Sequence, residues 1–460
     1  MESYFDAQEI AVLSQILKLA VVDITSDHLK RLLISLKGMD FTMNNKIFNI
    51  VAVLNETFKE IDIDFDDHME VMNSIGFLHL FDDLKDFRQP GKIQYNLSDI
   101  LLLCFLSIVY EGKTTCLGIY DHILVYKSRY EKYGLIKNGQ IPSHDTIRRT
   151  LMCIDPVEFE EITIGRIYEF LQELRKCAQG TMYCHQSVDG KEARGSGRGE
   201  DTKNPQRNIN VLNVYSNSDC LCIHSKPVET KTNEIPVAQE ILRLMDLKKT
   251  VITFDALHTQ RETCKIIASK KGVYVAPVKD NQAGLREEIL EKFKKHEQTP
   301  KKKITTLDTE KRNFSFISLP SNYDDCGFTG MKTFVKMVSH TRKKAITMYF
   351  ISNTKDTELI AEAIERRWEI ENNFHKEKDT YLNEDDIHFT NKTSINNIVI
   401  LNNLALALAK IYGSISTNEM RVAKKEFKAF PVECISKVQL IMKDTEIIKQ
   451  IKSNLRRKKR

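Results

Sequence analysis

From residue 181 onward, short runs of β-forming residues alternate with amphipathic helical runs, and this alternation restricts the fold more than any other feature of the chain. Three strands are predicted first, and the second and third flank Asn217-Ser218-Asp219, a hairpin signal. Helix, strand, helix and strand then follow. The seven predicted segments are residues 182–188, 209–215, 220–225, 235–245, 250–254, 261–270 and 273–276. The order βββαβαβ predicts an α/β fold in which the first and fourth strands can lie side by side.

The segments around this core predict a larger organisation. Both N-terminal segments have helical periodicity, and a strand-rich block later interrupts the α/β alternation. The predicted division is 1–75 for a helical appendage, 76–178 for a helical DNA-binding region, 179–300 with 353–412 for the core, 301–352 for an inserted β-subdomain, and 413–460 for a basic C-terminal tail.

Composition and end sequences indicate an intracellular protein. The apolar run at residues 100–110 is about half of the roughly twenty residues that a membrane-spanning helix needs, so we expect a buried core helix and no membrane partner. The start MESYFDAQEI is unlike a signal peptide, and ten cysteines without paired CxxC spacing favour reduced thiols. The runs Lys301–Lys303 and KSNLRRKKR can bind a polyanion such as DNA. We therefore expect a cytoplasmic protein whose basic segments can contact DNA.

Two aspartates follow predicted strands that the sheet order can bring together. Asp189 follows the first strand and precedes a glycine-containing loop, and Asp255 follows the fourth strand. The carboxyl ends of strands in α/β sheets are where side chains meet ligands. Two carboxylates this close need a counter-ion, and Mg²⁺ prefers hard oxygen ligands. An aspartate after a strand is by itself usually a turn or capping residue, so the pair carries the prediction.

The predicted helix over residues 356–378 supplies a third acid. Glu371 lies four residues after Arg367 and seven before Lys378, so all three are expected to project from one face of this helix. A carboxylate between two cations suits a metal site that also holds phosphate. A solvated face of ion pairs remains the alternative for this helix alone.

A helix start in the second helical region favours DNA contact. Ser143 is a suitable capping residue, and Arg148 and Arg149 follow within the first turns. These two arginines are expected to contact DNA, with an exposed, solvated pair as the alternative.

Many segments resemble the H-repeat-associated branch of bacterial insertion-sequence transposases. The resemblance spans about residues 80–412 in the order of that family. The matching segments are FDDLKDFR at 81–88, NLSDILL at 96–102, IPSHDT at 141–146, VDGK at 188–191 with RGS at 194–196, KTNEIP at 231–236, TFDA at 253–256, YVAPVKDNQ at 274–282, IEN at 370–372 and NED at 383–385. Two positions differ from the wider group: Ile364 stands where its signature has a tyrosine, and residues 307–313 lack the histidine-glycine-arginine segment.

The resemblance implies a ribonuclease-H-like mixed sheet core with a helical N-terminal region and an inserted β-subdomain. It also implies a DDE triad, with Asp189, Asp255 and Glu371 as catalytic and metal-binding residues and Mg²⁺ or Mn²⁺ as cofactor. Arg367 and Lys378 would contact DNA near the cut. The implied partner is double-stranded DNA with terminal inverted repeats, bound by a homodimer on paired ends.

The expected activity is metal-dependent DNA cleavage and strand transfer of an insertion sequence. Lys191 and Arg194, which follow Asp189, are expected to hold DNA phosphates. Two alternatives remain open at this point. One is a catalytically silent, transposase-derived DNA-binding protein, and the other is a related nuclease that does not join strands.

Overall fold

The computed structural model describes most of the chain from residue 80 onward. The described residues are 80–169, 183–194, 196–197, 208–228, 234–299, 304–309, 312–340, 345–387, 389, 391–415, 420–432, 434–435 and 438. The predicted appendage at 1–75, the Lys301–Lys303 run and the basic end of the tail lie outside them. The described residues divide into two compact units, which are a sheet unit within Thr181–Ala193 and Arg207–Lys376 and a helical unit containing the other described residues.

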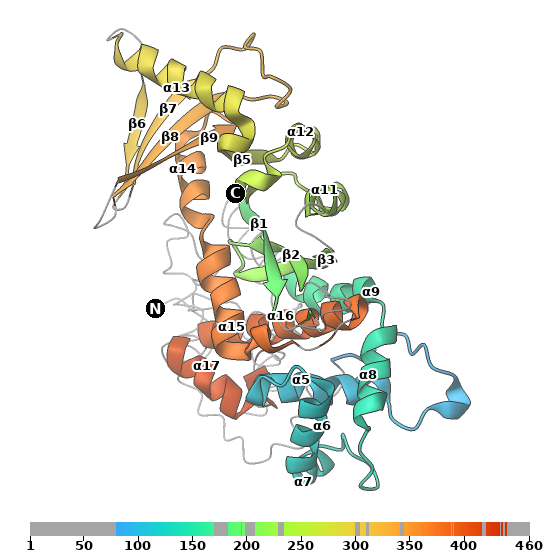
Figure 1. Cartoon of the computed structure of the whole chain (residues 1–460). Helices are drawn as coiled ribbons and strands as arrows, with labels where there is room; N and C mark the ends of the chain where they lie inside the picture. Colours follow the sequence, from blue (N-terminus) through green and yellow to red (C-terminus); the bar gives the residue numbers. More distant parts are fainter. Residues whose placement is uncertain are drawn as a thin grey trace, which may run out of the picture. The chain divides into compact units, whose positions relative to one another are not determined.

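The sheet unit holds nine described strands in one sheet, ordered β3-β2-β1-β4-β5-β9-β8-β7-β6 (Figure 1). The strands are β1 Cys184–Ala193, β2 Ile209–Ser216, β3 Leu221–Val228, β4 Thr250–Phe254, β5 Val273–Val278, β6 Thr305–Asp308, β7 Arg312–Ser318, β8 Thr333–His340 and β9 Ala345–Ser352. The first three strands pair antiparallel, whereas β1 with β4 and β4 with β5 pair parallel. The order of β1 to β5 confirms the predicted βββαβαβ pattern and the ribonuclease-H-like core.

Strands β6 to β9 extend this sheet. Each pairs antiparallel with its neighbour, and β9 pairs antiparallel with β5 from Val275↔Ser352 to Val278↔Tyr349. The strand-rich block that the sequence predicted is therefore joined to the core through continuous backbone hydrogen bonds. It belongs to the same compact unit as β1 to β5.

Helices lie on both sides of the sheet in Figure 1. The helices of this unit are α11 Glu234–Leu244, α12 Arg261–Ser269, α13 Ala283–Glu297 and α14 Thr357–Arg366, with short turns η5 Ala256–His258, η6 Asp280–Gln282 and η7 Glu371–His375. Asp356 caps α14 by accepting a hydrogen bond from the Leu359 amide at 3.0 Å. Ile360 and Ile364 of α14 are fully buried against Val251 of β4 and Phe350 of β9. This apolar packing fixes α14 on the sheet.

The described helical unit is built around α16. Its helices are α5 Leu97–Glu111, α6 Cys116–Val125, α7 Lys127–Lys132, α8 His144–Cys153, α9 Pro156–Glu160, α15 Lys376–Leu382, α16 Lys392–Ile415 and α17 Met420–Ala429, with turns η2 Pro90–Lys92, η3 Glu161–Gly165 and η8 Glu384–Asp386. Asn397 of α16 donates hydrogen bonds to the carbonyls of Leu151 and Ile154 at the end of α8. The predicted core helix at residues 100–110 is confirmed as the buried part of α5.

One described helix is long and apolar enough to span a membrane by length and composition. It is the Lys392–Gly413 part of α16, and 94% of its apolar window is buried inside the protein. Its apolar residues therefore form the core of the helical unit.

Candidate active site

Asp189 and Asp255 occupy equivalent positions on neighbouring parallel strands. The pairing of β1 with β4 ends at Val188↔Phe254, so the next residue of each chain segment is an aspartate. Asp255 follows the end of β4, as predicted. Asp189 does not end its strand, because β1 continues to Ala193 through pairing with β2 alone. Lys191 consequently lies on a strand instead of in a loop.

Glu371 reaches the site from the segment after α14. Two turn residues and then the helical residues Glu369 and Ile370 follow α14, and Glu371 begins the π-helical turn η7, which continues into α15. Phe374 within this turn is buried and stacks on Tyr215 of β2, with ring centroids 5.3 Å apart. This contact holds the Glu371 turn against the sheet.

The three acids interact electrostatically. Burial, together with the negative charges of Glu371 and Asp255, raises the pKa of Asp189 to about 7. The Gly190 amide, which donates to Asp189 Oδ1 at 3.0 Å, and the Arg367 guanidinium act in the opposite direction. This repulsion shows that the carboxylates of Glu371 and Asp255 lie close enough to Asp189 to affect its ionisation.

Asp255 differs from Asp189 because it has a cationic partner. Burial alone would raise the pKa of Asp255, but the Ala256 amide and the Lys279 ammonium outweigh it, so the pKa is lowered. Lys279 Nζ lies 3.2 Å from Asp255 Oδ1, and both side chains are about half exposed, at 53% and 46%. Asp255 is therefore the acid of this pair that stays ionised at neutral pH.

His375 and Asn213 lie beside Asp189. His375 Nδ1 is 3.7 Å from Asp189 Oδ2, and His375 Nε2 is 3.5 Å from Asn213 Nδ2. Asn213 is the β2 residue directly paired with Asp189. The site therefore combines three carboxylates with Lys279, Arg367 and His375.

Comparisons with known proteins agree with this geometry. The family model "Transposase DDE domain" matches residues 180–408, and "DDE_Tnp_1-associated" matches residues 78–165. "Putative transposase YncI" of Escherichia coli O157:H7 is 30% identical over 359 residues, which cover 74% of this chain and 89% of that protein. The chain belongs to the DDE transposase family.

Further relatives of this transposase support the same assignment. "H repeat-associated putative transposase YhhI" of Escherichia coli K12 is 30% identical over 321 residues, covering 66% of this chain and 82% of its own length. The predicted resemblance to the H-repeat-associated branch is thereby confirmed. The cryo-EM structure of the piggyBac transposase synaptic complex with hairpin DNA aligns over 90% of this chain and 86% of that chain, at 12% identity and a TM-score of 0.36, which is too low to support an inference.

DDE transposases generally use divalent metal ions, and the acids of this transposase fit such an ion chemically. Asp189, Asp255 and Glu371 supply hard oxygen ligands, and their mutual repulsion is what a cation would relieve. Within the described residues, no group of three His, Cys, Asp or Glu side chains is placed to ligate one ion together. Ligation by all three acids would therefore require their side chains to move closer.

Arg367 is the predicted DNA-binding residue that the sheet unit brings to the acids. It affects the pKa of both Asp189 and Asp255, and its guanidinium lies 4.4 Å from the ring centroid of Trp368. Arg312 lies on the same ring at 4.3 Å. Ile364, in place of the wider group's tyrosine, is fully buried in the core cluster and is a packing residue.

Lys378 is placed differently from the sequence expectation. Its side chain is 1% exposed, and Lys378 Nζ forms an ion pair with Glu384 Oε1 at 2.6 Å. Glu371, in contrast, is exposed. The π-helical turn η7 separates the two residues and changes the helical phase, so the spacing of seven does not keep them on one face. The predicted common face is therefore wrong for Lys378, whereas Arg367 and Glu371 both act on Asp189.

Arg194, Arg148 and Arg149 belong to the helical unit, whereas Lys191 lies on β1 of the sheet unit. Arg194 is 68% exposed and pairs with Asp385 at 3.1 Å. Arg148 and Arg149 are exposed on α8, which Ser143 caps as predicted. Arg148 also pairs with Asp145 at 3.2 Å. Their contact with DNA stays a prediction.

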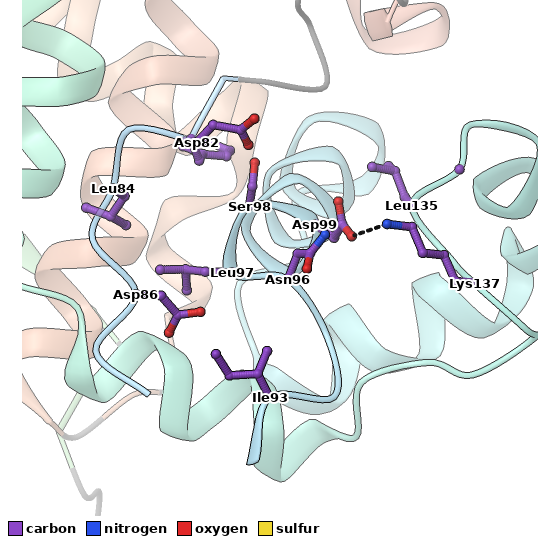
Figure 2. A pocket seen from close by; sticks show the side chains of 12 residues that line it. Asp82, Leu84, Asp86, Ile93, Asn96, Leu97, Ser98, Asp99, Leu135 and Lys137 are labelled. Atoms are coloured by element: carbon purple, nitrogen blue, oxygen red, sulfur yellow. Dashed lines mark ion pairs between the residues drawn. The ribbon is translucent and has the colours of Figure 1, made fainter. Parts of the chain in front are cut away.

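The helical unit also contains a pocket of about 420 Å³. Figure 2 shows Asp82, Asp86 and Asp99 on its wall, with Asp99 paired to Lys137 at 3.8 Å. Burial raises the pKa of Asp99. None of the triad residues lines this pocket, so it is separate from the chemistry of the DDE site.

The sequence reasoning did not assign a role to Lys279 or His375. Lys279 directly follows β5, the strand that pairs with β4, so its position at a strand end was a usable signal. His375 follows Glu371 by four residues in the same helical segment, but only the fold places it beside Asp189.

Proposed function

We propose that this chain is an insertion-sequence transposase that cleaves DNA in a metal-dependent reaction and joins the resulting 3′ end to target DNA. Its substrate would be double-stranded DNA with terminal inverted repeats, bound by a homodimer on paired ends. We place it in the bacterial cytoplasm, associated with the nucleoid.

The convergence of three acids carries this proposal. Asp189 and Asp255 follow the same register pair on parallel strands, and Asp189 has its pKa raised by burial and by the charges of Glu371 and Asp255. Such a cluster is unfavourable without a cation, and a nucleic acid phosphate brings divalent cations with it. Membership of the DDE transposase family supports the same chemistry.

The residues of the chain would act in distinct ways. Asp189, Asp255 and Glu371 would hold the divalent ions, which when bound activate the attacking oxygen and stabilise the leaving oxygen. Lys279 and Arg367 place positive charge beside the acids and would hold phosphate oxygens. Lys191, Arg194, Arg148 and Arg149 would extend the contact along the DNA.

The test is Mg²⁺-dependent cleavage of DNA that carries the flanking inverted repeats. The native chain is expected to cut, Asp255→Asn is expected to lose cutting while still binding DNA, and Asp246→Asn is expected to cut like the native chain. Asp246 is a matched control because it is an exposed aspartate before the other end of β4. Binding by all three without cutting would identify a silent DNA-binding protein instead.

A second DNA in the same reaction separates a transposase from a nuclease. With donor and target DNA present, strand transfer yields joined products, and hydrolysis alone yields only cut donor. Cut donor without joined product would refute the proposed strand transfer and leave the nuclease.

A further inference from the structure

Two buried titratable residues that the proposed mechanism does not use lie beside the catalytic aspartates. Glu234 is the first residue of α11 and is 6% exposed, and His258 is the last residue of η5 and is 2% exposed. Glu234 Oε2 lies 3.6 Å from His258 Nε2. Burying two such polar groups is unfavourable unless they pair with each other, so each residue depends on the other's position.

Glu234 packs directly against the residue after Asp189. A Cβ added at Gly190 would lie 2.9 Å from the carboxylate carbon and both carboxylate oxygens of Glu234. A side chain at Gly190 would therefore displace the Glu234 carboxylate. The Gly190 amide also donates a hydrogen bond to Asp189 Oδ1 at 3.0 Å. Displacement of Glu234 would therefore change the position of the Asp189 carboxylate through Gly190.

His258 belongs to the turn that begins directly after Asp255. Its amide donates to the Asp255 carbonyl at 2.9 Å and closes the turn. The next residue, Thr259, is held by a hydrogen bond from its hydroxyl to the Pro277 carbonyl at 2.7 Å. The backbone of His258 is therefore fixed relative to Asp255, and its imidazole meets Glu234 from this turn.

We propose that the Glu234–His258 pair is a positioning device that fixes the spacing between Asp189 and Asp255 for divalent-metal binding. The pair links the Gly190 side of one aspartate to the turn after the other. Both members are buried, so they act through the aspartates and do not touch DNA. This inference rests on the proposed metal-dependent function of the same site.

The test measures the affinity of the full chain for Mn²⁺ by electron paramagnetic resonance of the free ion. Glu234→Gln keeps the side-chain shape and removes the charge, and it is expected to weaken Mn²⁺ binding about 10- to 100-fold, as is common for residues that orient metal ligands. Gly190→Ala changes neither member of the pair but displaces the Glu234 carboxylate, so a similar loss is expected. Because both changes act on one contact, the double variant is expected to lose less than the product of the two single losses.

Two matched controls exclude general effects. Glu240→Gln removes an exposed ion pair of the same helix, the 2.6 Å contact with Lys226, and Gly284→Ala adds a Cβ with no atom within 4 Å. Both are expected to bind Mn²⁺ like the native chain. Circular dichroism identifies any variant that fails to fold. If Glu234→Gln does not fold, the Mn²⁺ affinity of Gly190→Ala tests the proposal.

The outcomes distinguish this inference from the proposed function. Native-like Mn²⁺ affinity in Glu234→Gln and Gly190→Ala, together with loss in Asp189→Asn, would overturn the positioning role alone. Equal affinity in the native chain and Asp189→Asn, or no Mn²⁺ binding by either, would overturn both the proposed metal site and the pair's role.

Discussion

Asp189 is the acid of this site whose ionised form is disfavoured most clearly. Burial and the charges of Glu371 and Asp255 raise its pKa to about 7, whereas Lys279 helps to keep the pKa of Asp255 low. The two aspartates therefore differ in protonation near neutral pH, although they occupy equivalent places on adjacent strands. A bound divalent ion would remove this difference.

The raised pKa predicts a pH dependence of stability without metal. The folded state keeps the Asp189 proton up to about pH 7, while the unfolded chain releases it near 3.8, so the stabilisation is complete below pH 3.8 and is lost as pH rises through 7. Between pH 5 and 8 in chelator, we expect a loss of about 1–3 kcal/mol, at roughly 1.4 kcal/mol per pKa unit and reduced for partial exposure. Asp255 titrates below this window because its pKa is lowered.

Urea unfolding at several pH values measures this effect. Asp189→Asn carries no titrating carboxyl, so it is expected to lose this part of the pH dependence, and Asp246→Asn is expected to retain it. Parallel curves for the native chain and Asp189→Asn would show that Asp189 does not titrate in this range.

At the scale of elements, the segment from α14 to α15 sets the position of Glu371. The apolar face of α14 packs on β4 and β9, and the π-helical turn after it changes the helical phase. Lys378 of α15 consequently becomes a buried partner of Glu384. An ion pair buried this deeply is a structural contact.

Lys378→Met tests that structural role. Removing the ammonium leaves the Glu384 carboxylate buried without it, so the free energy of unfolding is expected to fall by about 3–5 kcal/mol. Lys376→Met, an exposed change on the same helix, is expected to change it by at most about 0.5 kcal/mol. The double variant Lys378→Met/Glu384→Gln should recover part of the loss. Native stability with weakened DNA binding in Lys378→Met would instead support the DNA contact expected from the sequence.

At the scale of the whole molecule, all three acids belong to one of two compact units. The sheet unit contains Asp189, Asp255 and Glu371, whereas the predicted DNA-contacting helix α8 belongs to the helical unit. The proposed metal binding and the predicted DNA contact by α8 would therefore belong to separate compact units. Ligands that bind one core stabilise that core.

This division predicts that Mn²⁺ stabilises only part of the molecule. In calorimetry we expect two thermal transitions, of which the sheet unit's transition rises with Mn²⁺ by about 2.7 kcal/mol of stability at a hundredfold excess over the dissociation constant. Asp189→Asn is expected to remove the shift, and Asp246→Asn to keep it. A shift of both transitions, or of neither, would contradict the assignment of the metal site to the sheet unit.

The sequence by itself determined the βββαβαβ order, the buried α5 segment and the place of Asp255 at a strand end. Each of these follows from local periodicity, which reports whether a segment is strand or helix and which of its residues are buried. The order of the matching motifs further predicted that the three acids act as a set. The tertiary structure alone decided that β9 joins β5, that Lys378 is buried on Glu384, and that Glu234 meets His258 beside Gly190. Those contacts join residues that are far apart in the sequence or out of helical phase. Periodicity shows that a side chain is buried, but it does not show which residue the side chain packs against.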